Sequence, residues 1–171
     1  MKRLLRRLLL LTVLLPLAAC SSDKPRAYNI HMAYDAATVD HFRIFPTVEI
    51  DIVAADAATA EQLSKMEIDD YFDPANFIRS SLRKKTYFFS QEKHDKQVLE
   101  RKDAIWKNWV DKRRCPYVVL FANLPRDGGK GPDLRRVKLP LAGNRWEGDD
   151  IELSIVPAGL LLQTPMNPEE D

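Results

Sequence analysis

Alternation of apolar and charged residues is the feature that most narrows what this chain can fold into. In the stretch PTVEIDIV, the residues Val48, Ile50 and Ile52 alternate with Glu49 and Asp51. Side chains of a β-strand point to opposite faces in turn, so this period of two is typical of a half-buried strand. The pattern predicts a β-sheet with one face toward a core.

Further apolar, aromatic or alternating runs predict more strands, the most apolar being PYVVLFANL at 116–124. The other runs are at 85–90, 97–101, 134–141 and 151–156. Strands at this spacing, separated by turn residues and interrupted by helices, are typical of a sandwich. We therefore predict a mainly β chain, an antiparallel β-sandwich with one or two inserted helices.

The first 19 residues have the pattern of a secretory signal peptide. Four basic residues (Lys2, Arg3, Arg6 and Arg7) precede an apolar run from Leu8 to Leu17. A transmembrane anchor is the alternative, but an uninterrupted span needs about 20 apolar residues, and this run is shorter. A cleaved leader is therefore expected.

The end of this leader, Leu17-Ala18-Ala19-Cys20, resembles the lipobox of bacterial lipoproteins. The resemblance implies that Cys20 carries diacylglyceryl and acyl lipid and becomes the mature amino terminus. It also implies the periplasmic face of the outer membrane, because Ser21 rather than Asp follows the cysteine. More than one acyl chain makes such anchoring stable. An ordinary signal peptide is the alternative, and it would leave Cys20 as a free thiol.

Removal of the leader leaves 152 residues and takes away four of the 26 basic side chains but none of the 25 acidic ones, so the net charge becomes −3. A slightly negative net charge does not indicate a basic surface that would bind nucleic acid. About 150 residues make one domain. The predicted organisation is a signal peptide at 1–19, a lipidated tether at 20–40 that ends in an edge strand, the sandwich at 41–166 and a disordered acidic tail at 167–171.

The second cysteine, Cys115, has no disulfide partner in the chain once Cys20 is acylated. We expect a small buried apolar residue at this position. Arg113 and Arg114 beside it leave a reactive thiol as the alternative, since nearby cations lower a thiol pKa.

Three segments between the strands carry recognisable local signals. Thr59-Ala60-Glu61-Gln62 has capping-box spacing and predicts a short helix. Residues 66–83 lack a sustained period and predict an ordered loop with aromatic anchors. The glycine-rich stretch 126–133 lacks the Ser or Thr and the helix that a phosphate-binding loop needs, so we expect a solvated hairpin.

A longer helix is predicted from Asp103 to about Arg113, where Ile105, Trp106, Trp109 and Val110 share one helical face. Packing of this face on the sheet is the first interpretation. A ligand platform built from the two tryptophans is the alternative.

No catalytic or metal-binding residues are predicted. The histidines His31, His41 and His94 form no pair with metal-ligand spacing, and no nucleophile elbow is present. Adjacent acids at Asp69-Asp70 and Asp149-Asp150 are expected to face water. Convergence of two acids from distant loops, as in glycosidases, stays open. We expect no enzyme and no cofactor apart from the lipid.

Taken in order, these features resemble the outer-membrane lipoprotein of the bacterial type VI secretion system. The lipobox, the strand PTVEIDIVA, a short helix with Leu63, the strand PYVVLFANL and the closing IELSIV carry the resemblance from Cys20 to about Gln163. It implies a transthyretin-like β-sandwich that binds the periplasmic part of a large inner-membrane subunit. In that family a loop following the first strand contributes to the contact.

Matched by order, that loop corresponds to the region from Asp56 to Arg83, in which Tyr71, Phe72 and Phe77 are the partner-binding candidates. Aromatic residues are favoured interface anchors, although the same side chains are equally suited to anchoring the loop on its own domain. The alternative function is a lipid-anchored binding module for a small ligand or cell-wall fragment, held between the Trp106 helix and the sheet.

Overall fold

A computed structural model describes residues 24–126 and 132–169 of the chain. The predicted signal peptide, Cys20 and the glycines of the 126–133 loop lie outside these residues. Among the helices in the described part, none is long and apolar enough to cross a membrane.

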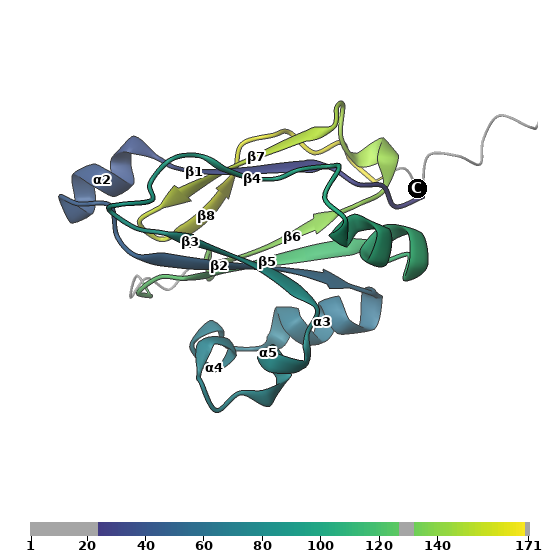
Figure 1. Ribbon diagram of the computed structural model, residues 1–171, viewed down its shortest axis with the longest axis horizontal. Coiled ribbons are helices and arrows are strands. Elements are labelled where there is room, and N and C mark those ends of the chain that lie inside the picture. Colours follow the sequence, from purple (N-terminus) through teal and green to yellow (C-terminus); the bar gives the residue numbers. More distant parts are fainter. Residues whose placement is uncertain (1–23, 127–131, 170–171) are drawn as a thin grey trace, which may run out of the picture.

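Two four-stranded sheets stack face to face (Figure 1). The first has the order β4-β1-β7-β8 and the second the order β3-β2-β5-β6. The strands of the first sheet are β4 (Gln97–Leu99), β1 (Asn29–Tyr34), β7 (Asp150–Val156) and β8 (Gly159–Leu162). Those of the second are β3 (Lys84–Phe89), β2 (Val48–Ala55), β5 (Tyr117–Asn123) and β6 (Arg136–Pro140). The predicted β-sandwich with inserted helices is confirmed.

The main core lies between the two sheets and follows the alternation of the sequence. Ile30 and Met32 of β1 point into it, as do Val48, Ile50 and Ile52 of β2, and all five side chains are fully buried. The run that the sequence marks as most apolar, β5, lies between β2 and β6 and is buried on both of its faces. Central placement thus explains its lack of polar alternation.

Strand β1 differs from the edge strand predicted at the end of the tether. It pairs with β4 on one side and with β7 on the other, so it is an interior strand. Its pairing with β7 is parallel, with Asn29 opposite Asp150 and Tyr34 opposite Ile155, whereas the other strand pairs are antiparallel. The sheet structure therefore begins by residue 29.

The predicted helix near the two tryptophans is present as η1 (Lys107–Lys112), a π-helical segment in which Arg113 N donates to Asn108 O, five residues back. Trp109 is fully buried and Trp106 is 3% exposed, with their rings in a T-shaped contact at 5.4 Å. Core packing of this face is confirmed. The two rings leave no exposed platform for a ligand.

The thiol of Cys115 is free and 2% exposed. Burial raises the pKa of Cys115 above its ordinary value, although Arg113 acts in the opposite direction. The thiol therefore stays protonated at neutral pH, as expected for a small buried apolar residue rather than a reactive one.

The chain end also differs from the disordered tail predicted at 167–171. Asn167 donates from its backbone nitrogen to Arg145 O at 2.9 Å, and Glu169 forms an ion pair with the Arg145 side chain at 2.7 Å. These contacts tie residues 167–169 to the 3₁₀ turn η2 (Gly143–Arg145).

Candidate docking surface

Three short helices follow β2 and cover the outer face of the second sheet (Figure 1). They are α3 (Ala57–Lys65), α4 (Ile68–Phe72) and α5 (Phe77–Ser81). A second buried cluster joins α3 and α4 to the sheet: Val53, Ala55, Ala60, Leu63, Ile68, Tyr71, Val119 and Phe121. The region from Asp56 to Arg83 is thus a helical layer packed on its own domain.

Helix α3 begins one turn earlier than the capping-box pattern predicts. Its cap is Asp56, whose carboxylate accepts a hydrogen bond from Thr59 N at 2.8 Å. The backbone hydrogen bond from Thr59 lowers the pKa of Asp56. The predicted helix is present, but the cap is an aspartate that the sequence pattern did not single out.

Tyr71 anchors α4 to the sheet. Its ring is fully buried and stacks on Phe121 with the ring centroids 3.9 Å apart. Its hydroxyl donates to Asp51 Oδ2 at 2.9 Å. Burial, and then the neighbouring Asp51 carboxylate, raise the pKa of Tyr71 well above its ordinary value. This side chain is enclosed by its own domain and offers no surface to a partner.

A buried carboxylate fixes α5 in the same way. Asp51 is fully buried and accepts from Arg79 Nε at 2.8 Å and from Thr86 Oγ1 at 2.5 Å. The same guanidinium forms an ion pair with Glu49. Charged groups rarely become buried unless they are paired and hydrogen-bonded, so this network accounts for a carboxylate beneath a helical layer.

Phe72 lies between the two anchors. The Arg79 guanidinium lies 4.7 Å from the centre of its ring, and the Tyr71 ring meets it edge-on at 5.0 Å. Phe72 is half-buried and packs against the second cluster. The structure therefore brings Tyr71 and Phe72 together as parts of the domain's own packing.

Phe77 differs from these two residues because 78% of its side chain is exposed. It is the first residue of α5, and the preceding cap, Asn76, accepts from Ile78 N at 2.8 Å. Beside it, a groove of about 360 Å³ runs between α5 and β3 and is bordered by Phe88, which is 54% exposed. Phe77 is therefore an exposed aromatic side chain on a fixed backbone.

A second exposed apolar residue follows the true first strand. Because β1 precedes β2, the segment after the first strand is 35–47 rather than 56–83. It contains α2 (Ala36–Phe42), which is attached to the sandwich through Thr38 Oγ1, a donor to Ile155 O at 2.6 Å. Ile44 in this segment is 60% exposed. Counting from β1 places the segment after the first strand at 35–47, whereas counting from β2, as the sequence predicts, places it at 56–83.

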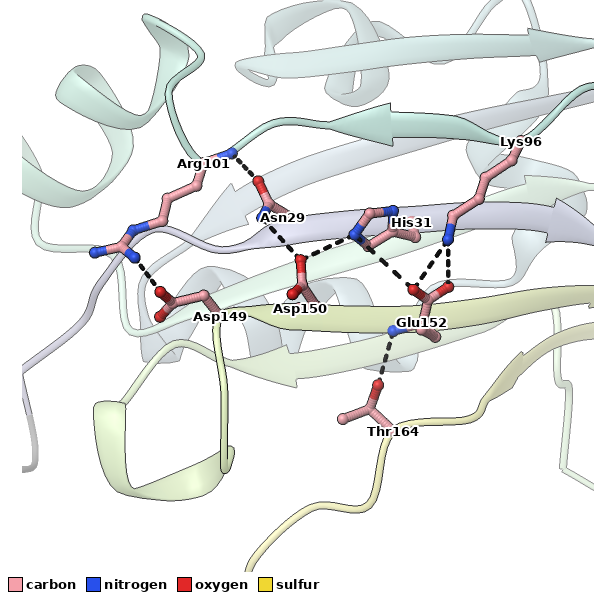
Figure 2. A network of polar contacts seen from close by, with 8 residues as sticks. All are labelled: Asn29, His31, Lys96, Arg101, Asp149, Asp150, Glu152 and Thr164. Atoms are coloured by element: carbon pink, nitrogen blue, oxygen red, sulfur yellow. Dashed lines mark hydrogen bonds and ion pairs between the residues drawn. The ribbon is translucent and has the colours of Figure 1, made fainter.

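Charged side chains cover the outer face of the first sheet (Figure 2). His31 Nε2 lies 3.0 Å from Asp150 Oδ1, and Lys96 Nζ lies 3.0 Å from Glu152 Oε1. Hydrogen bonds from His31 and Asn29 lower the pKa of Asp150.

The adjacent acids of this face are exposed to water, as expected, and are also paired with basic side chains. Asp149 forms ion pairs with Arg101 and, at 3.2 Å, with Arg26, while Asp150 meets His31. On β7 itself, Asp150 and Glu152 share the outer face because they are two residues apart. The arrangement joins β1, β4 and β7 at their surface. Within 24–126 and 132–169, no three acidic, histidine or cysteine side chains form a group that fits a metal ion.

No family model and no curated protein matches this chain. Several solved structures share its fold. A chain of a type VI membrane complex superposes with a TM-score of 0.55 at 12% identity, covering 81% of this chain and 98% of the other.

Two further structures agree with this match. The type VI secretion lipoprotein TssJ1 from Pseudomonas aeruginosa has a TM-score of 0.52 at 11% identity, and Lip from Serratia marcescens, a membrane-bound component of the type VI secretion system, has 0.50 at 13%. Each comparison covers 86% of this chain and 99% of the other. The chain therefore has the fold of type VI secretion envelope components, among them a type VI secretion lipoprotein.

Proposed function

We propose that this protein is a docking lipoprotein of a type VI secretion envelope complex. It is anchored at the periplasmic face of the outer membrane through lipid on Cys20, and it binds the periplasmic part of a large inner-membrane subunit. The observation that carries the proposal is the shared fold: the matched structures include a type VI membrane complex and a type VI lipoprotein. The lipobox at Cys20 supports it independently.

Phe77 is the best-placed contact of the three predicted aromatic residues. Binding energy in interfaces concentrates in a few anchors, often aromatic. Tyr71 is buried and Phe72 is half-buried against its own domain, whereas the Phe77 ring projects from a capped helix. A fixed backbone lowers the entropy lost on binding. Tyr71 and Phe72 then act by holding this surface in place.

Phe77→Ala is expected to weaken capture of the inner-membrane partner by about 30-fold, the effect of losing one interface anchor of roughly 2 kcal/mol. The measurement is a pull-down from solubilised envelopes onto the lipoprotein, followed by titration of the captured subunit. Leu161→Ala is the matched control, because Leu161 is also exposed, at 47%, but lies on β8 of the other sheet.

Ile44→Ala, tested in parallel, separates two surfaces. Loss of capture with Ile44→Ala but not with Phe77→Ala would move the contact to residues 35–47 and contradict the role of Phe77. If the wild-type protein captures no envelope protein, while a muropeptide raises its melting temperature, docking fails and a ligand-binding module replaces it.

Cys20→Ser is expected to leave an uncleaved precursor that no longer incorporates palmitate, since the thiol is the proposed site of acylation. Metabolic labelling and the mass of the protein measure both effects. Cys115→Ser is the matched control, because this second cysteine is buried and is expected to leave processing unchanged. A normally processed Cys20→Ser protein would rule out lipid at this position.

A further inference from the structure

The chain enters the fold very close to the proposed lipid. Pro25 bridges to Ala142, and Arg26 N donates to Leu141 O at 2.9 Å, so the packed domain begins at residue 25. Whatever their conformation, the five residue steps from Cys20 to Pro25 span at most about 18 Å. Given the lipidation of Cys20 in the proposed function, the end of the sandwich that holds Pro25 lies against the membrane.

That end of the sandwich carries a groove of about 450 Å³ beside the entering chain. In Figure 1 the start of β1 and the helical turn that contains η1 lie at this end, opposite α2. Four basic side chains line the groove, against two acidic ones. The basic residues are Arg26, Arg101, Lys102 and Lys107, and the acidic residues are Asp103 and Asp111. We call this surface the entry groove.

The cations of this surface are only partly neutralised. Arg26 and Arg101 share one carboxylate, that of Asp149, and Asp103 is already paired with Lys85. Lys102 and Lys107 are exposed, as is Lys24 just before the groove.

For these three lysines, the ion pairs of residues 24–126 and 132–169 include no carboxylate partner. The chain that follows the leader has a net charge of −3, yet its membrane-side end is positive. Basic side chains thus outnumber acidic ones where the chain enters the fold.

We propose that the entry groove lies on the anionic headgroups of the membrane that holds the lipid, with Lys24, Lys102 and Lys107 facing the phosphates. Basic side chains near an anionic membrane surface are attracted to it over about one Debye length, and the short tether keeps them within that range. The lipid anchors the domain, and the groove orients it. The opposite end, with α2 and Ile44, then points away from the membrane toward the periplasm.

The test uses the full-length lipidated protein in vesicles of phosphatidylcholine alone or of equal parts phosphatidylcholine and phosphatidylglycerol. A membrane-impermeant amine reagent labels exposed lysines, and mass spectrometry gives the rate at each position. Labelling of Lys24, Lys102 and Lys107 is expected to slow about fivefold in the anionic vesicles. Lys93, in the turn between β3 and β4 at the far end, is the internal control and keeps its rate.

Two further measurements test whether the protection of the lysines is electrostatic. Salt at about 1 M shortens the Debye length to about 3 Å and is expected to abolish the protection. Lys102→Gln with Lys107→Gln is expected to remove the protection of Lys24. The matched pair Arg43→Gln with Lys93→Gln, at the opposite end, is expected to retain it.

Three outcomes overturn the proposal. Equal labelling in the two vesicle types, with the protein still floating with them, rejects the orientation alone. Protection by inorganic phosphate in neutral vesicles would assign the groove to a small anion instead of a membrane. A protein that does not float with vesicles at all would reject the lipid anchor of the proposed function, and this inference with it.

Discussion

Trp109→Ala is expected to lower the free energy of unfolding by about 3–5 kcal/mol, the range for removing a buried large aromatic side chain. The indole is fully buried and contacts Trp106 edge-on. Its loss opens a cavity at the end of the main core, where η1 closes the space between the sheets. The mutant protein retains the β-sandwich but unfolds at lower temperature.

Thermal and urea unfolding, followed by circular dichroism, measure the effect. A domain of this size is expected to lose roughly 10 °C in Tm. Phe88→Ala is the matched control, because its ring is 54% exposed, and it should shift Tm by far less. An unchanged Tm in Trp109→Ala would mean that the ring is free, which would restore the ligand platform as an interpretation.

The sequence predicts the sandwich well wherever a strand has one face toward the core. Ile50 and Ile52 alternate with charged neighbours, and the structure places them in the main core. The β5 run is apolar on both faces and is indeed central. These features depend on burial, which the pattern of side chains records directly.

The alternation of apolar and polar side chains does not show in which direction a strand runs or which strands lie beside it. The partners of Ile30 in β1 are Leu99 and Ile151, which lie far along the chain. A short alternating run therefore indicates a strand without saying whether it is interior or parallel. For the same reason, the sequence pattern predicts only the end of a tether at β1, whereas the structure shows an interior strand there.

Burial beneath the helices that cover the second sheet is a further feature that the sequence pattern does not predict. Asp51 alternates with apolar neighbours, a pattern that predicts the solvent face, yet it is fully buried and contacts Tyr71 of α4 and Arg79 of α5. The buried Asp51 carboxylate is paired with Arg79, which lies 28 residues later in the chain. Nothing in the spacing connects the two residues, because their contact depends on how the helices fold back. The candidate aromatics were found from sequence, but only the structure separates buried Tyr71 from exposed Phe77.

Arg79→Met is expected to destabilise the domain by about 3–5 kcal/mol, the cost of leaving a buried charge without its partner. The guanidinium supplies the cation that faces Asp51 at 2.8 Å and also pairs with Glu49. Methionine keeps most of the side-chain length but brings no charge and no hydrogen-bond donor. The Asp51 carboxylate would retain only the hydroxyls of Tyr71 and Thr86.

The consequence extends to docking, because Arg79 lies two residues after Phe77 on α5. Arg79→Met is expected to weaken partner capture as well as stability, whereas Phe77→Ala weakens capture alone. Arg79→Lys keeps the charge but not the planar fork, so it should recover part of the stability.

Arg43→Met is the control, because Arg43 is exposed and lies outside the helical layer formed by α3, α4 and α5. Urea unfolding of the wild-type protein and of these four variants, together with titration of the partner, tests this coupling. Wild-type stability in Arg79→Met would show that apolar packing alone holds α5 on the sheet. A stable Arg79→Met protein that also captures the partner fully would show that the Arg79 contacts have no role in docking.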